Sequence, residues 1–176
     1  GSQSGISGYS NIAAQFGLNL GGSGSVFRET DNIIAFVKSR NMIVQTLLSK
    51  ATFGTGSELL VDRYAKVNEL DKKWKESDRL RNIKFSSDDG GYLQDSLLNK
   101  IYERIIKNDL EVEKPDKKLS ILILKMKSND ELFAKEFTET LLQNVIDFYV
   151  KVQTKKEAEN VAVLKHHTDS VRKLLN

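Results

Sequence analysis

The stretch LSILILKMKSNDELF, residues 119–133, decides how the fold is predicted. Its first half is apolar on both faces at the centre, with Leu119, Ile121 and Ile123 on one face and Leu122 and Leu124 on the other. A strand of this kind is usually buried between layers. The preceding LEVEKPDKK, residues 110–118, indicates a shorter strand and a turn. We therefore expect a small sheet covered by amphipathic helices, with further strands supplied from outside this sequence or by another chain.

A long helix follows the second strand. Ser128 and Glu131 have the spacing of an S-x-x-E capping box, and neither Pro nor Gly occurs between Glu131 and the last residue. These features predict one continuous helix over residues 131–175. Its first half has a wide apolar row suited to packing on a sheet, formed by Phe133, Phe137, Leu141, Val145, Phe148 and Val152.

The apolar row changes character beyond QTKKEAEN, residues 153–160. It narrows to Val161, Leu164, Val171 and Leu175, a pattern typical of a coiled-coil seam. This half of the helix is expected to leave the globule and to need a partner helix. The four residues are therefore our candidate self-association seam.

Shorter helices are predicted upstream. Thr30 or Asp31 caps a first helix and Ser39 caps a second, while TFGTG at residues 52–56 breaks the helical pattern. Ser57 is expected to open a longer helix whose apolar stripe comprises Leu60, Tyr64, Val67, Leu70 and Trp74. Another helix follows the SSDDGG turn at residues 86–91. The predicted class is α+β.

Composition excludes several functions. The net charge is only +3, and basic residues alternate with acidic ones, so we expect no nucleic-acid partner. The longest unbroken apolar run, residues 33–37, is far shorter than the roughly 20 residues that span a bilayer. We also find no signal peptide, and Gly1 and Ser2 have the character of an expression-tag remnant. The chain is expected to be a soluble piece of a larger protein.

No motif predicts chemistry. In QFGLNLGGSGS, residues 15–25, Ser23 stands where a phosphate-binding loop needs Lys. The pair His166 and Asp169 could bind a metal only weakly, and a Ser-His-Asp triad cannot be built from neighbours on one helix. The acidic run before Gly90 lacks the calcium-loop spacing. We predict no catalytic, cofactor-binding or metal-binding residue, and therefore no enzyme and no cofactor.

Two segments carry a family resemblance. DNIIAFVKSRNMIVQTLL, residues 31–48, follows the Gly/Ser-rich AAQFGLNLGGSGS and resembles the Wzz-type chain-length determinants, also called polysaccharide co-polymerases. The sequence from KLSILILKMK onward, residues 118–176, resembles the strand and long helix of the same family. The match covers most of the chain, and the spacing D-N-I-I-x-x-x-K-S-R-x-x-x-x-x-x-L-L is its most specific part. Residues 52–118 match only in general character.

This resemblance implies a periplasmic, inner-membrane-anchored protein with an α/β base domain and a helical arm. Such proteins assemble as homo-oligomers and set the length of O-antigen or related lipopolysaccharide polymers, together with a Wzy-type polymerase and the growing glycan. On this basis residues 1–30 are the tag remnant and irregular segment, 31–152 the base domain, and 153–176 the ascending half of a truncated arm. Both membrane helices, the proline-rich segment and the returning half of the arm are absent from this sequence.

The function expected from the resemblance is a non-enzymatic periplasmic scaffold that regulates polysaccharide chain length. One alternative is a periplasmic adaptor or coiled-coil interaction module of an export system, although such adaptors usually carry lipoyl-like halves that this chain lacks. An enzyme is the other alternative, and it would require a polar constellation that the sequence does not contain.

Overall fold

The computed structural model describes residues 30–87, 91–116 and 121–174. The chain divides into two compact units, of which the first is Phe27–Asn144 and the second includes helix α7 from Val145 onward. Each unit is described by itself. The α+β class is confirmed, because both units are rich in helix and the strands form two small antiparallel pairs.

Helix α3 (Arg40–Leu47) is the centre of the first unit and contacts α2 (Thr30–Val37), α4 (Leu60–Val67) and α6 (Gly91–Arg104). The predicted cap is confirmed: the Ser39 hydroxyl accepts a hydrogen bond from the Met42 backbone N–H at 3.4 Å. Four residues of α3 are buried, namely Met42, Ile43, Thr46 and Leu47. The segment DNIIAFVKSRNMIVQTLL therefore supplies core helices of this unit.

A β-hairpin replaces the predicted break and the start of the predicted long helix. Strands β1 (Lys50–Phe53) and β2 (Gly56–Leu59) pair antiparallel, with Phe53 opposite Gly56. Gly54 has a φ of 64°, which a two-residue hairpin turn requires and which glycine adopts without strain. The prediction that Ser57 opens a helix was wrong, because Ser57 lies in β2.

The predicted helix to Trp74 is two helices. Helix α4 ends at Val67, and α5 (Leu70–Lys75) begins after Glu69, whose φ of 54° lies in the left-handed region. Tyr64 is buried on α4, as the apolar stripe predicted, whereas no residue of α5 is fully buried. The change of direction at Glu69 gives α5 its own orientation.

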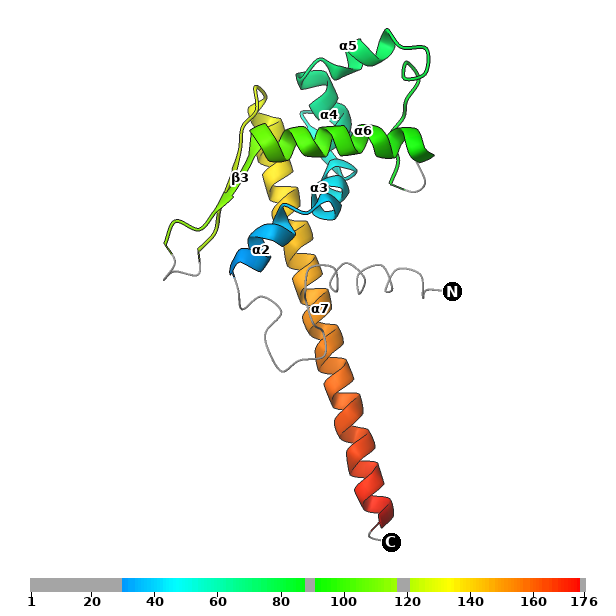
Figure 1. Ribbon diagram of the computed structural model, residues 1–176, viewed down its shortest axis with the longest axis vertical. Coiled ribbons are helices and arrows are strands. Elements are labelled where there is room, and N and C mark those ends of the chain that lie inside the picture. The colour runs from blue at the N-terminus through cyan, green and yellow to red at the C-terminus, as the bar shows by residue number, and fades with distance from the viewer. Residues whose placement is uncertain (1–29, 88–90, 117–120, 175–176) are drawn as a thin grey trace. The chain divides into compact units, whose positions relative to one another are not determined.

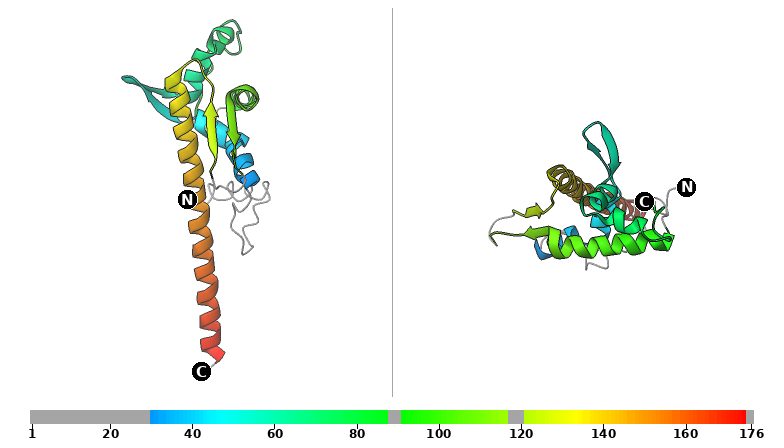
Figure 2. Two further views of the ribbon diagram at one scale, coloured as in Figure 1. Left: turned by 90° about the vertical axis from the view of Figure 1, so that its left-hand side faces the viewer. Right: turned by 90° about the horizontal axis from the view of Figure 1, so that it is seen from above.

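The second hairpin follows α6. Helix α6 continues through one π-helical turn, η1 (Ile105–Asp109), into β3 (Leu110–Glu113), which pairs antiparallel with β4 (Ile123–Met126). Figure 1 shows this hairpin between α6 and the first turns of α7, and both views of Figure 2 show the β1–β2 hairpin apart from it. The single sheet covered by helices was thus a wrong prediction, because within residues 30–87, 91–116 and 121–174 each strand pairs with one neighbour only.

Strand β4 is also shorter and less buried than predicted. Ile123 and Leu124 are half-buried, and Ile121 is 53% exposed. We expected a strand that is apolar on both faces and buried between two layers. Within the described residues, however, β4 has β3 as its only strand partner. The apolar residues of β4 therefore remain partly exposed to solvent.

Helix α7 (Glu131–Leu174) confirms the predicted long helix. Its start differs from the prediction: Asp130, not Ser128, is the cap, because Asp130 Oδ1 accepts from the Phe133 N–H at 3.1 Å. Ser128 Oγ instead accepts from the Asp130 N–H. The predicted apolar row is largely confirmed, since five of its members are buried: Phe133, Phe137, Leu141, Phe148 and Val152.

Candidate functional site

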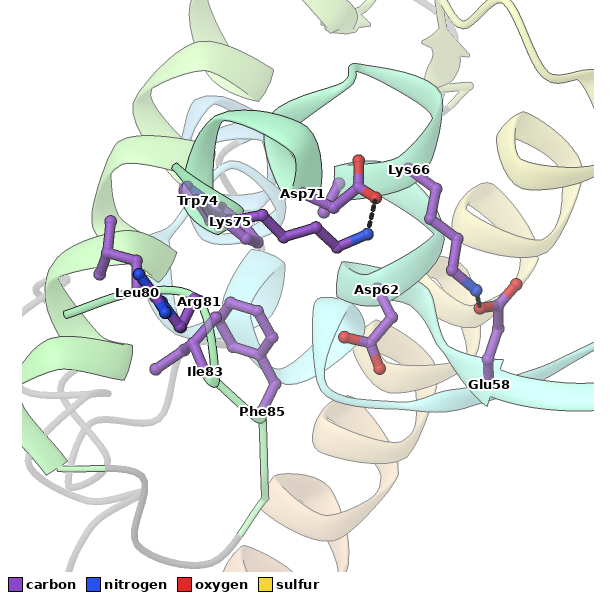
Figure 3. A pocket seen from close by; sticks show the side chains of 11 residues that line it. Glu58, Asp62, Lys66, Asp71, Trp74, Lys75, Leu80, Arg81, Ile83 and Phe85 are labelled. Atoms are coloured by element: carbon purple, nitrogen blue, oxygen red, sulfur yellow. Dashed lines mark hydrogen bonds and ion pairs between the residues drawn. The ribbon is translucent and has the colours of Figure 1, made fainter. Parts of the chain in front are cut away.

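One pocket in the first unit combines aromatic and charged side chains (Figure 3). It encloses about 370 Å³ and is formed by β2, α4, α5 and the segment that follows α5. We call it the Trp74 pocket. Its lining residues are Glu58, Asp62, Ala65, Lys66, Asp71, Trp74, Lys75, Leu80, Arg81, Ile83 and Phe85.

The apolar wall of the Trp74 pocket is built from α5 and the segment after it. The Trp74 and Phe85 rings pack with centroids 5.7 Å apart and planes tilted by 52°, a geometry favoured for aromatic pairs. The buried Gln94 of α6 fixes this segment by two hydrogen bonds of 2.8 Å, since its amide oxygen accepts from the Ser86 N–H and its amide nitrogen donates to the Ser86 carbonyl. Phe85 is thereby held against Trp74.

The charged wall carries two ion pairs. Lys66 pairs with Glu58, and the Lys75 ammonium lies 3.5 Å from the Asp71 carboxylate. Glu58 is also bound by Arg63 at 3.5 Å, and Arg63 itself forms a 2.6 Å bond to Asp130. Two of the three carboxylates that line the pocket therefore have a cationic partner.

Asp62 is the third carboxylate. It makes no hydrogen bond or ion pair with any residue that the structure describes, and its side chain points into the pocket in Figure 3. Burial raises the pKa of Asp62; the nearby Lys66 acts in the opposite direction, and Glu58 adds to the rise. The pocket thus presents one partly buried acceptor whose hydrogen-bonding capacity is not used within the described chain.

The engagement of each lining carboxylate decides which carboxylate chemistry the pocket can support. Glycoside hydrolysis, for example, needs two carboxyl groups that work as a pair. Here Glu58 and Asp71 are held by lysines, so Asp62 has no second carboxylate that is equally free. What remains is a set of fixed donors and acceptors facing an aromatic wall.

A second, smaller pocket of about 290 Å³ lies between α4, η1 and the loop before α7. Within it the Tyr64 hydroxyl donates to Asp109 Oδ2 at 2.6 Å, and Arg104 donates to Asn68 Oδ1 at 2.6 Å. Burial and the hydrogen bond to Asp109 raise the pKa of Tyr64. These contacts join α4 to the π-helical turn, so we assign them a structural role.

The candidate seam stays a prediction. Val161 is 64% exposed on α7, while positions 164 and 171 lie on the same helix and Leu175 lies outside the described residues. His166 and Asp169 also lie on α7, whereas the Gly/Ser-rich loop at residues 15–25 and the acidic run at residues 88–90 lie outside the described ranges.

In the described part of the chain, no three His, Asp or Glu side chains are grouped so that they could hold a metal ion. None of the helices in the same ranges has the length and apolar character needed to cross a bilayer. Comparison with known family models, curated proteins and solved structures finds no match.

The sequence analysis missed the Trp74 pocket. Trp74 was placed in the buried stripe of one long helix and was not considered as part of a site. The signal that could have been used is Trp74 itself, a large aromatic residue among the eight charged residues of NELDKKWKESDR, residues 68–79. The turn at Glu69, which orients this segment, has no such signal.

Proposed function

We propose that this chain is the periplasmic part of an inner-membrane-anchored regulator that sets the length of O-antigen or a related surface polysaccharide. In this proposal it is a non-enzymatic scaffold of the Wzz type. It acts as a homo-oligomer beside a Wzy-type polymerase and the growing glycan. Its membrane anchors belong to parts of the parent protein outside this sequence.

One observation carries the proposal: the segment 118–176, which resembles the family's strand and long helix, contains β4 followed closely by the 44-residue helix α7. The most specific motif, D-N-I-I-x-x-x-K-S-R-x-x-x-x-x-x-L-L, supports it from the other end of the chain. The motif spans α2 and α3, and two of its fixed residues, Ser39 and Leu47, are buried. Buried motif residues fit the role of a scaffold, because such residues stabilise the fold and do not perform chemistry.

Self-association is supported by apolar side chains that remain open. On α7 the exposed ones are Leu132, Leu142, Ile146, Val150 and Val161, with exposures between 44% and 64%. Strand β4 has a single strand neighbour within the described residues, and an open edge can pair with another chain. In this proposal the helical arm begins within α7, and Val161, Leu164, Val171 and Leu175 form its coiled-coil-like seam.

Deletion of the parent gene tests the proposal. Surface polysaccharide from the deletion strain is separated by gel electrophoresis and compared with wild type and with a strain complemented by the full-length gene. We expect polymer to persist with its preferred length lost, and complementation to restore that length. An unchanged length distribution would contradict length control. Complete loss of polymer would point instead to an enzyme of synthesis.

A further inference from the structure

We propose that the Trp74 pocket binds one neutral saccharide ring of a glycan chain. The inference rests on the proposed function only for the source of that glycan, since the binding chemistry comes from the pocket itself. No residue in this pocket was singled out by the sequence as a ligand site.

The charge of the pocket favours a neutral ligand. Three carboxylates and three cations line it, so the formal charges cancel. An anionic ligand would meet the Asp62 carboxylate, which has no partner among the described residues, and a cationic ligand would lie among Lys66, Lys75 and Arg81. A neutral ligand rich in hydroxyl groups avoids both costs, because hydroxyls can donate to Asp62 and accept from the lysines.

The shape of the lining favours a ring. A pyranose has a polar rim of hydroxyl groups and an apolar face of C–H bonds, and the electron-rich face of an aromatic ring attracts such C–H groups. The pocket has the matching division, with Trp74 and Phe85 on the apolar wall and Asp62, Asp71 and Lys75 among the polar lining. A volume of about 370 Å³ lies at the small end of the range of roughly 300–1,000 Å³ for ligand sites. This size suits one ring of a longer chain.

The pocket is also held in place before any ligand arrives. Phe85 is fixed through the two hydrogen bonds between Gln94 and Ser86, and Asp71 and Glu58 are held by ion pairs. Side chains that are already ordered lose little entropy on binding. Asp62 alone lacks a partner among the described residues, and a sugar hydroxyl would supply it.

Trp74 gives a direct readout, because it is the only tryptophan of the chain. The protein is titrated with maltotriose, with chitotriose, with the trimer of galacturonate and with sorbitol, while indole fluorescence is recorded. We expect a saturable change with at least one neutral trimer and weaker binding of the galacturonate trimer. Sorbitol, which has hydroxyls but no ring face, should have no effect at equal concentration.

Variants locate the site. Asp62→Asn should weaken binding about tenfold or more, because a hydrogen bond to a charged group contributes at least the ~1.4 kcal/mol that corresponds to tenfold. Trp74→Ala should abolish binding, measured by saturation-transfer NMR on the sugar. The matched controls are Asp95→Asn and Tyr92→Ala, which change an exposed carboxylate and an exposed aromatic ring outside the pocket. Circular dichroism shows whether each variant is folded. If the Trp74→Ala protein is unfolded, the affinity of the Asp62→Asn protein tests the site by itself.

The absence of a saturable response to any of the trimers, an equal response to sorbitol, or unchanged affinity of folded Asp62→Asn and Trp74→Ala proteins would overturn the inference. These failures are distinct from failure of the proposed function. A pocket that binds no sugar leaves length control by the parent protein intact. A deletion strain with normal polymer length leaves sugar binding by the pocket intact.

Discussion

Asp62 shows at the scale of one residue how a site differs from the solvated surface around it. Its neighbours Glu58 and Asp71 have lysine partners, whereas Asp62 has none among the described residues. Partial burial raises the pKa of Asp62 because water no longer fully solvates its charged form. An ionised Asp62 therefore costs stability, and residues that do so are frequent at functional sites.

Asp62→Asn is expected to raise the free energy of unfolding at pH 7. Because the folded-state pKa is raised, the stability of the wild type is complete below the ordinary Asp pKa of about 3.9 and falls as the pH rises through the folded-state value. The advantage of the variant should thus grow from acid to neutral pH. It should stay below about 1 kcal/mol, because solvent screens a partly exposed group. Urea unfolding between pH 3 and 7 measures it.

The control for this experiment is Asp95→Asn, whose carboxylate is 68% exposed and pairs with Arg40. It should show no gain at pH 7. An Asp62→Asn protein that is less stable than wild type at neutral pH, or whose advantage is greatest in acid, would show that Asp62 is stabilised by the fold.

At the scale of an element, the start of α7 depends on Asp130. Its carboxylate caps the helix through the Phe133 N–H and binds Arg63 of α4 at 2.6 Å. Burial alone would raise the pKa of Asp130, but the bonds from Arg63 and from the Phe133 and Leu132 N–H groups outweigh it and lower the pKa. One side chain therefore begins a helix and ties it to another.

Two substitutions separate these roles. Asp130→Ala should destabilise the protein by about 1–2 kcal/mol through loss of the cap, and further through loss of the ion pair. Asp130→Asn keeps a capping oxygen, so it should lose only the ion-pair contribution. Because the folded-state pKa is lowered, the Asp130 contribution is present above the ordinary pKa and is lost as the pH falls through the folded-state value. Thermal unfolding at pH 7 and pH 3 measures both, and equal stabilities of the two variants would contradict a capping role.

The elements show which parts of the fold could be predicted from the sequence. Ser39 was found because a capping hydroxyl just before an apolar period is a local signal, and α7 because no residue interrupts its pattern. The capping box at Ser128 was wrong because Asp130 offers a second local cap, which competes for the same N–H groups. Glu69 could not be found, since no local residue pattern marks its left-handed backbone, which separates α4 from α5.

The same distinction applies to the candidate site. Local patterns indicated which residues are charged or aromatic, but the Trp74 pocket joins residues from Glu58 to Phe85 through a hairpin and a turn. Sequence periodicity treated the part from Ser57 to Trp74 as one helix, with Trp74 in its buried stripe. The pocket can be predicted only if the helix is divided at Glu69.

At the scale of the whole molecule, open apolar surface predicts association. We expect the chain to form dimers or larger oligomers, because each buried apolar side chain of the seam would contribute about 1.5–3 kcal/mol. The double substitution Val161→Asp and Leu164→Asp should weaken association by at least about a hundredfold, which corresponds to ~2.8 kcal/mol. Light scattering coupled to size exclusion, over a hundredfold range of concentration, measures both.

Thr154→Asp is the control, because it adds the same negative charge at an exposed polar position of the same helix outside the seam. It should associate like the wild type. A wild-type chain that stays monomeric throughout the concentration range would refute the seam, as would a double variant that associates as strongly as the wild type.

The two bonds between Gln94 and Ser86 also have a kinetic consequence. They hold both backbone polar groups of Ser86 much as a neighbouring strand would, yet the holder is a side chain of α6. Local opening of a segment releases only those amides whose partners lie within the opening unit. The Ser86 amide should therefore exchange its hydrogen with solvent as slowly as the amides of α6. The amides of the residues around Ser86 should exchange at the faster rate of a loop. Ser86 and α6 would then open as one cooperative unit.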